Sequence, residues 1–230
     1  MSSDLFLSEL PGEITVSQLY ASGGVLNIPG LVAADAVAEL EAEALSARSA
    51  GRRNVLAVSD AAEGRGGNPD RAFTSAHARF VQWRLYSAPA LVASLVRTCG
   101  IVATPTGGGT YSYYEQAGDF LGLHRDILTC DLTVITCLRD TGAATGVGAL
   151  LVYSKHMNEP LARARAAGRA AATEVPIPRG ETVALLGGAV PHEVTPMQPG
   201  QERIVSVMCF RIAVTGDPTG SVPRPSLESR

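Results

Sequence analysis

The chain has little charge, and it lacks any long uninterrupted apolar run. Charged residues make up 18% of its 230 residues, and acidic residues outnumber basic ones by 22 to 19. General nucleic-acid binding depends on a basic surface, so we expect no nucleic-acid partner. No stretch approaches the ~20 apolar residues of a membrane-spanning helix. Asp4 and Glu9 also stand where a secretory leader has its apolar core. We therefore expect a cytoplasmic protein with no membrane partner.

Cysteine is scarce as well. The chain has four cysteines, and no two of them form a Cys-x-x-Cys pair. Such pairs are typical of zinc sites and of redox-active motifs, and four scattered cysteines do not indicate a disulfide framework. We expect four reduced, mostly buried thiols, at Cys99, Cys130, Cys137 and Cys209.

Apolar residues are plentiful, at 46% of the chain. A chain of this length and composition is able to bury a sizeable core and fits one domain. We expect that domain to span residues 1–214. The segment 215–230 is rich in proline and serine, and we expect it to be a disordered tail.

From Gly107 onward, short apolar stretches alternate with glycine and proline, which is typical of an all-β sandwich or barrel. We expect strands at 110–115, 122–126, 130–138, 148–153, 174–177, 182–186, 191–194 and 204–213.

The residues before Gly107 are predicted to be mainly helical. A strand at 25–28 is expected, and 54–58 is at most a short strand. Ser87 is expected to cap the last of three helices. The helices are expected at 31–48, 73–86 and 89–98.

Two segments are candidates for covering a site. Residues 49–72 are rich in glycine and arginine and are interpreted either as a lid or as a plain connector. Residues 154–173 are alanine-rich and basic, which favours a helical insertion. The basic residues of this segment are Lys155, Arg163, Arg165 and Arg169. They are interpreted either as facing an anionic substrate or as a solvated helix face.

Two residues of metal-ligating types stand two positions apart, His124 and Asp126. On an extended strand their side chains point to the same face, about 7 Å apart at the backbone. Because an imidazole and a carboxylate alone leave a divalent ion too exposed, a third ligand is needed, and His192 is the candidate. Two imidazoles and one carboxylate form the facial triad of non-haem Fe(II) oxygenases. Arg203 precedes an apolar run, where a buried guanidinium needs a carboxylate partner.

Taken together, His124-x-Asp126, His192 and Arg203 resemble the His-x-Asp…His…Arg signature of the Fe(II)/2-oxoglutarate-dependent dioxygenase superfamily, in its prolyl-hydroxylase and phytanoyl-CoA-hydroxylase-like branch. The resemblance implies a mainly β fold with flanking helices (α+β). Its centre would be a double-stranded β-helix, a jelly-roll or cupin-like barrel buttressed by N-terminal helices. It also implies Fe(II) as cofactor, 2-oxoglutarate and O2 as co-substrates, and hydroxylation of an unactivated C–H bond of a small molecule, with release of succinate and CO2.

The resemblance further implies contacts to 2-oxoglutarate. Arg203 would pair with the carboxylate far from the metal, Thr133 would offer a hydroxyl to the same carboxylate, and Tyr114 would touch the co-substrate. Tyr111 and Tyr113 are the alternatives to Tyr114 for this contact. Core packing is the alternative role for each of the three tyrosines. Relatives often carry a serine two residues after the arginine, whereas this chain has Val205 there. Ser206, three residues after Arg203, is expected to point to the opposite face of the strand.

A second class of function is compatible with the same ligands. A cupin-like metal-binding protein, or an oxygenase that does not use 2-oxoglutarate, would need the triad but not Arg203. Arg203 therefore favours the 2-oxoglutarate enzyme. Halogenating relatives replace the carboxylate ligand by a small residue, so Asp126 argues against halogenation.

Overall fold

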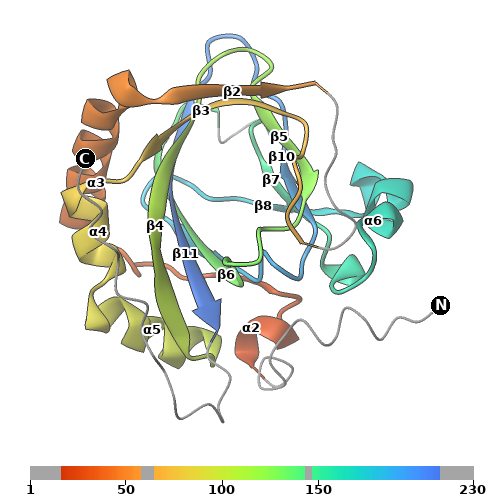
Figure 1. Cartoon of the computed structure of the whole chain (residues 1–230), viewed down its shortest axis with the longest axis horizontal. Helices are drawn as coiled ribbons and strands as arrows, with labels where there is room; N and C mark the ends of the chain where they lie inside the picture. The colour runs from red at the N-terminus through yellow and green to blue at the C-terminus, as the bar shows by residue number, and fades with distance from the viewer. Residues whose placement is uncertain (1–16, 58–64, 143–146, 213–230) are drawn as a thin grey trace, which may run out of the picture.

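The computed structural model describes residues 17–57, 65–142 and 147–212. Its strands join into one antiparallel sheet, in the order β1-β9-β6-β11-β4-β3-β5-β10-β7-β8, with β2 paired to β3. The sheet curls into a barrel, with α3, α4 and α5 along the side of β4 and with α6 beyond β7 and β10 (Figure 1). The predicted jelly-roll class with flanking helices is confirmed. The expected tail at 215–230 lies outside the described residues.

The strands are β1 Val25–Asn27, β2 Arg52–Leu56, β3 Arg71–His77, β4 Ala103–Tyr114, β5 Phe120–His124, β6 Leu132–Asp140, β7 Leu150–Val152, β8 Thr173–Val175, β9 Thr182–Leu185, β10 His192–Val194 and β11 Arg203–Ile212. The α-helices are α2 Gln18–Ala21, α3 Ala34–Ala47, α4 Phe80–Tyr86, α5 Pro89–Cys99 and α6 Leu161–Ala167. Short 3-10 helices occur at Arg48–Ala50, Ser154–His156 and Arg169–Ala171. Within the described ranges, none of the helices has the length and apolar character needed to cross a membrane.

All eight strands predicted after Gly107 are present, and the helical prediction for 73–86 is wrong in its first half. Residues Arg71–His77 form β3, which pairs with β2, β4 and β5. Pairing on both sides outweighs the helical spacing of the apolar residues there, because strand propensity depends strongly on neighbours. Only Phe80–Tyr86 is helical.

Ser87 does not cap the helix that follows it. The N-cap of α5 is Ala88, which makes no side-chain capping bond, and Pro89 begins the helix. The Ser87 hydroxyl instead donates to the Trp83 carbonyl at 2.7 Å and so satisfies the end of α4. Proline at the first helical position needs no backbone donor, which accounts for a start without a polar cap.

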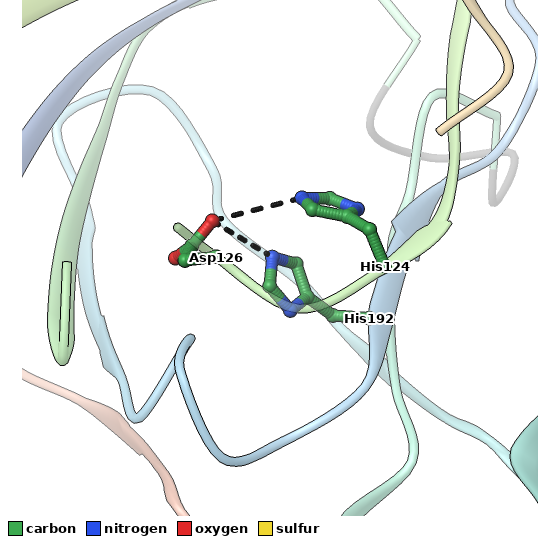
Figure 2. Close-up of side chains that lie close together, drawn as sticks. All are labelled: His124, Asp126 and His192. Atoms are coloured by element: carbon green, nitrogen blue, oxygen red, sulfur yellow. Dashed lines mark ion pairs between the residues drawn. The ribbon is translucent and has the colours of Figure 1, made fainter. Parts of the chain in front are cut away.

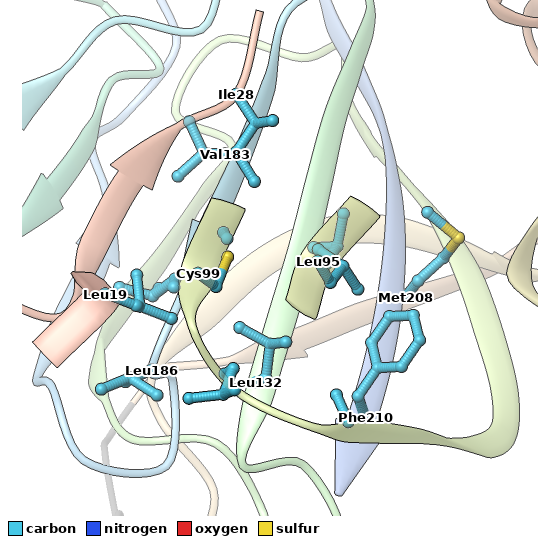
Figure 3. Close-up of a cluster of buried hydrophobic side chains, with 14 of the residues drawn as sticks. Leu19, Ile28, Leu95, Cys99, Leu132, Val183, Leu186, Met208 and Phe210 are labelled. Atoms are coloured by element: carbon cyan, nitrogen blue, oxygen red, sulfur yellow. The ribbon is translucent and has the colours of Figure 1, made fainter. Parts of the chain in front are cut away.

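The sheet has two apolar faces, and β11 shows how its side chains alternate between them. Met208 and Phe210 face outward and pack with Leu95 of α5 (Figure 3). Val205 faces the other way and packs with Tyr114 inside the barrel. The inner face is therefore lined by a separate apolar cluster, and it is the face from which a site inside the barrel is built.

Candidate metal centre

Two histidines face each other across neighbouring strands. His124 ends β5 and His192 begins β10, and the two residues are direct partners in the antiparallel ladder. Their rings lie 4.3 Å apart between centroids. Asp126 follows just beyond β5, with its Oδ1 at 3.6 Å from His124 Nε2 and 3.8 Å from His192 Nε2 (Figure 2). One ligand atom from each residue falls within 4.8 Å of the others, so the structure brings the three predicted ligands together.

Hydrogen bonds to the backbone orient both imidazoles. His124 Nδ1 lies 2.8 Å from the Gly122 carbonyl and His192 Nδ1 lies 2.9 Å from the Val190 carbonyl. A carbonyl only accepts, so each Nδ1 carries the proton, and each Nε2 directs its lone pair towards Asp126. This tautomer, fixed by a backbone acceptor, is the usual arrangement of a histidine that binds a metal.

The site also holds His192 and Asp126 in the charge states that a metal requires. Burial, together with the neighbouring His124, lowers the pKa of His192 to about 4, so its imidazole is neutral near pH 7. For Asp126, burial raises the pKa, but the neighbouring His124 and His192 and the hydroxyl of Thr133 outweigh burial and leave the pKa well below its ordinary value. Neutral imidazoles and an ionised carboxylate are the ligand forms that bind metal.

Asp126 is held by two neighbours. The hydroxyl of Thr133, on β6, donates to Asp126 Oδ2, and the backbone N–H of Asp126 donates to the Gly187 carbonyl at 2.8 Å. A Cβ atom at Gly187 would overlap Asp126 Oδ2, so this position needs glycine. Thr133 was expected to contact the far carboxylate of 2-oxoglutarate. The structure instead engages its hydroxyl with the candidate metal ligand.

Arg203 lies at the opposite end of the same strands. Cys209 of β11 pairs with Thr133 of β6, whereas Arg203 pairs with Asp140, at the other end of that strand. Arg203 NH2 lies 2.8 Å from Asp140 Oδ2, and both side chains are almost fully buried. We call His124, Asp126 and His192 the metal end, and Arg203 with Asp140 the arginine end. The sequence predicted a carboxylate partner for Arg203 and assigned that place to the co-substrate, whereas Asp140 already supplies one.

Of the three tyrosines considered, Tyr114 alone lies on the inner face beside Arg203. It pairs with Arg203 in the β4–β11 ladder and stacks on Phe73 at 5.3 Å between ring centroids. Tyr111 donates to Glu43 at 2.6 Å and Tyr113 donates to a carbonyl of α3 at 2.7 Å. Those two tyrosines therefore anchor α3, and the core-packing interpretation holds for them.

Similarity searches find no match among models of known protein families and none among curated proteins. Solved structures do match. A prolyl-4-hydroxylase from Pseudomonas putida superposes with a TM-score of 0.56 at 19% identity, over 84% of this chain and 95% of that one. The epimerase SnoN, solved with Fe3+, alpha ketoglutarate and nogalamycin RO, gives 0.61 at 17% identity, over 90% of each chain. HygX from Streptomyces hygroscopicus, solved with nickel and 2-oxoglutarate, gives 0.58 at 16% identity, over 84% of each chain.

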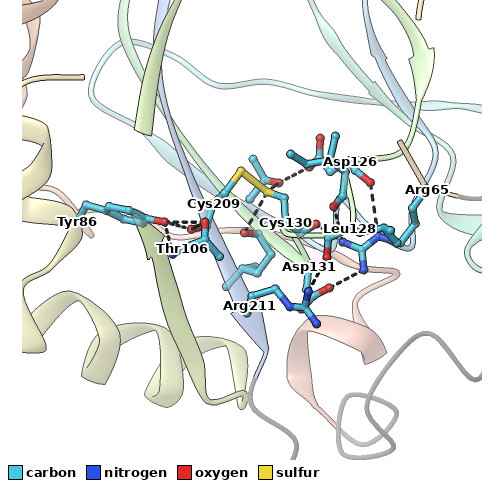
Figure 4. The surroundings of a disulfide bond; sticks show 12 residues. Arg65, Tyr86, Thr106, Asp126, Leu128, Cys130, Asp131, Cys209 and Arg211 are labelled. Atoms are coloured by element: carbon cyan, nitrogen blue, oxygen red, sulfur yellow. Dashed lines mark hydrogen bonds and ion pairs between the residues drawn. A yellow bond between two sulfur atoms is a disulfide. The ribbon is translucent and has the colours of Figure 1, made fainter. Parts of the chain in front are cut away.

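The fold is that of the Fe(II)/2-oxoglutarate oxygenases. In this oxygenase fold the chain has a feature that the sequence did not reveal, a buried arginine behind the metal end. Arg65 comes from the segment interpreted as a lid or connector, and its side chain is only 3% exposed. It donates to the carbonyls of Ile127 at 2.7 Å and Cys130 at 2.6 Å, and it pairs with Asp131 at 2.5 Å (Figure 4). The loop that follows Asp126 is thus fixed from behind.

The prediction of four reduced thiols is wrong for two of them. Cys130 and Cys209 form a disulfide, with Cα atoms 5.0 Å apart (Figure 4), whereas Cys99 and Cys137 are free and buried. The pairing of β11 with β6 places Cys209 opposite Thr133, and the loop before β6 returns Cys130 to the same place. Local spacing of cysteines carries no information about partners 79 residues apart.

The alanine-rich segment after β7 contacts the residue next to a candidate metal ligand. Arg169 donates to Glu193 at 2.6 and 3.0 Å, and Tyr153 donates to the same carboxylate at 2.5 Å. Glu193 is buried and directly follows His192. Arg169 is therefore occupied by a structural ion pair, while Arg163 and Arg165 are exposed on α6.

Proposed function

We propose that this chain is a non-haem Fe(II)- and 2-oxoglutarate-dependent dioxygenase that hydroxylates an unactivated C–H bond of a small molecule, such as an amino acid or a secondary metabolite. The observation that carries the proposal is the convergence of two oriented Nε2 atoms and one carboxylate oxygen within 4.8 Å. Two imidazoles and one carboxylate on one side of an ion fit Fe(II) and leave other coordination positions open.

Each residue then has a defined task. His124, Asp126 and His192 would hold the metal, while Thr133 and the Gly187 carbonyl keep Asp126 in place. When bound, the iron with its co-substrate supplies the oxidising chemistry, with 2-oxoglutarate and O2 consumed and succinate and CO2 released.

The protein's own contribution lies in placement and in the exclusion of water. Arg203 would receive the far carboxylate of 2-oxoglutarate, because the planar guanidinium fork matches two carboxylate oxygens. Tyr114 stands beside it on the inner face. Val205 lies on the same inner face, in a buried apolar cluster with Tyr114 and Met197.

A cupin-like metal protein that does not use 2-oxoglutarate is the second candidate. One observation favours it: the buried carboxylate of Asp140 is itself a partner of Arg203. In that case the arginine would serve the fold rather than catalysis.

Anaerobic titration separates the two candidates. Fe(II) is added first and 2-oxoglutarate second, with binding followed by visible absorption and calorimetry. The dioxygenase proposal expects one Fe(II) per chain and saturable binding of 2-oxoglutarate that depends on iron. A screen of small molecules for stimulated succinate release, with analysis of the product, then identifies the substrate class and the reaction. Iron binding without any 2-oxoglutarate binding would favour the cupin-like protein.

A further inference from the structure

The arginine end contains a carboxylate that the proposed reaction does not use. Asp140 ends β6 directly across from Arg203, and its side chain is 2% exposed. Its Oδ1 accepts a hydrogen bond from the Gly142 backbone at 2.8 Å, and its Oδ2 faces Arg203 NH2 at 2.8 Å. A buried aspartate in this place is held by the turn after β6, so it does not swing away from the arginine freely.

The remaining donors of Arg203 are distributed unevenly. NH1 donates to the Gly148 carbonyl, and NH2 donates to the Ile177 carbonyl at 3.2 Å in addition to its contact with Asp140. Nε is buried and has no acceptor among the described residues. A guanidinium has five N–H donors in a rigid plane, so fixing both terminal nitrogens also fixes the direction of Nε. The arginine is thus positioned, neutralised and still able to donate.

A small cavity adjoins this guanidinium. Its volume is about 40 Å³, and Arg203 lines it together with Val147, Ile177 and Glu174. An unpaired buried donor next to a cavity indicates a place where an acceptor binds.

We propose that Asp140 determines how strongly the arginine end binds a carboxylate and how well it distinguishes 2-oxoglutarate from other 2-oxo acids; this inference rests on the proposed function. Asp140 holds Arg203 in position and competes with the co-substrate for its charge. A far carboxylate that reaches Arg203 enters a site that is already neutral, and it lies close to a second buried carboxylate. Like charges in a buried site disfavour each other's ionised form. A 2-oxo acid without the second carboxylate meets no such repulsion.

Replacing Asp140 by asparagine removes the competing charge and keeps an oxygen acceptor of the same size. In the Fe(II)-loaded full-length protein, Asp140→Asn is expected to bind 2-oxoglutarate about tenfold or more tightly than wild type, because Arg203 is no longer neutralised. Its affinity for 2-oxopentanoate, which has no far carboxylate, is expected to stay within about twofold. The measurement is anaerobic calorimetry with each acid, with Fe(II) affinity and melting temperature recorded in parallel.

Two variants control for altered folding. Asp140→Glu keeps the charge and is expected to retain the weaker, wild-type affinity for 2-oxoglutarate. Glu41→Gln removes a carboxylate that pairs with Arg139 and Arg179 outside the barrel, and it is expected to change neither affinity. If Asp140→Asn binds 2-oxoglutarate no more tightly than wild type does, the inference is wrong and the dioxygenase proposal stands. If wild type and Asp140→Asn both bind Fe(II) but neither binds 2-oxoglutarate, the proposed function itself fails.

Discussion

The metal end and the arginine end of the barrel hold their charges in opposite states. At the metal end, the Asp126 carboxylate faces two imidazoles and the Thr133 hydroxyl, and the buried Arg65 nearby is paired with Asp131 rather than with the Asp126 carboxylate. At the arginine end, the positive charge of Arg203 is already matched by Asp140. The first arrangement attracts a cation, whereas in the second the charge of the arginine is already matched and only its Nε still lacks an acceptor among the described residues. The geometry thus supports the metal more directly than it supports the co-substrate.

The largest effect is expected from removing a ligand at the metal end. His124→Ala, Asp126→Ala or His192→Ala is expected to abolish substrate turnover and to weaken Fe(II) binding by more than about 100-fold, since even residues that only support metal ligands often cost 10- to 100-fold. The measurements are Fe(II) titration and succinate release, with circular dichroism to verify folding.

His77→Ala is the matched control, because His77 is exposed at the end of β3. It is expected to leave iron binding and turnover unchanged. Full succinate production by any of the three alanine variants would remove that residue from the triad.

The next largest effect tests the arginine end. Arg203→Met keeps similar length and removes the charge, so 2-oxoglutarate affinity is expected to fall by about 2 to 5 kcal/mol, as when one partner of a buried charge pair is lost. Fe(II) affinity is expected to change little, because Arg203 is not a ligand. Calorimetry on the iron-loaded protein measures both.

Arg203→Met also leaves Asp140 as an unpaired buried charge, which destabilises the fold. The double variant Arg203→Met/Asp140→Asn removes both charges and is expected to recover melting temperature but not 2-oxoglutarate affinity. Unchanged 2-oxoglutarate affinity in the single variant would make the cupin-like protein the better account. Arg179→Met, at a largely exposed arginine, is the matched control.

A third effect concerns pH and the metal end alone. In the metal-free protein the pKa of His192 is lowered from 6.5 to about 4, so between these values the unfolded chain binds a proton that the folded chain does not. Stability therefore falls as pH falls from about 6.5 to about 4, by up to about 3 kcal/mol. Asp126 remains ionised through this window, because its pKa is well below its ordinary value. The loss of protein stability that comes with protonation of Asp126 therefore occurs at still lower pH.

Urea unfolding of the metal-free protein at several pH values measures this dependence. His192→Gln is expected to flatten it, whereas His77→Gln is expected to leave it unchanged. The same slope in wild type and His192→Gln would show that another group is responsible.

The strand period of two accounts for what the sequence predicted well. It placed His124 and Asp126 on one face, and it placed Ser206 on the face opposite to Arg203, where Ser206 now accepts a hydrogen bond from Gln82 at 2.7 Å. Both predictions depend only on local alternation of side chains. The eight strands after Gly107 follow from the same periodicity and from the glycines and prolines that separate them.

What the sequence did not predict depends on register and on loops. Asp140 faces Arg203 because β6 and β11 pair with a shift between Ile204 and Val205, and no local pattern reveals such a shift. Arg65 belongs to a glycine-rich segment without periodicity, and nothing in that segment indicates that this arginine, rather than its neighbours, is buried. The Cys130–Cys209 disulfide arises from the same strand pairing.

The smallest effect is expected from Arg65, which supports the metal end without touching the metal ligands' side chains. Arg65→Lys keeps the charge that pairs with Asp131, but a lysine ammonium does not reproduce the planar fork that reaches the carbonyls of Ile127 and Cys130 together. The loop that carries Asp126 is then less well held, and Fe(II) affinity is expected to fall by about tenfold, in the range found for residues that orient metal ligands.

Variants of two other arginines show whether Arg65 positions Asp126 or only stabilises the fold. Arg211→Lys alters a partner of Asp131 that donates to the Leu128 carbonyl on the outside of the same loop. Arg71→Lys alters an arginine of β3 whose side chain donates to Pro69 and Asn68, away from that loop. We expect Fe(II) affinity to fall most for Arg65→Lys, less for Arg211→Lys and not at all for Arg71→Lys. A lower melting temperature for Arg65→Lys with unchanged Fe(II) affinity would mean that the clamp stabilises the fold but does not position Asp126. The position of the Asp126 carboxylate would then depend on Thr133 and the Gly187 carbonyl alone.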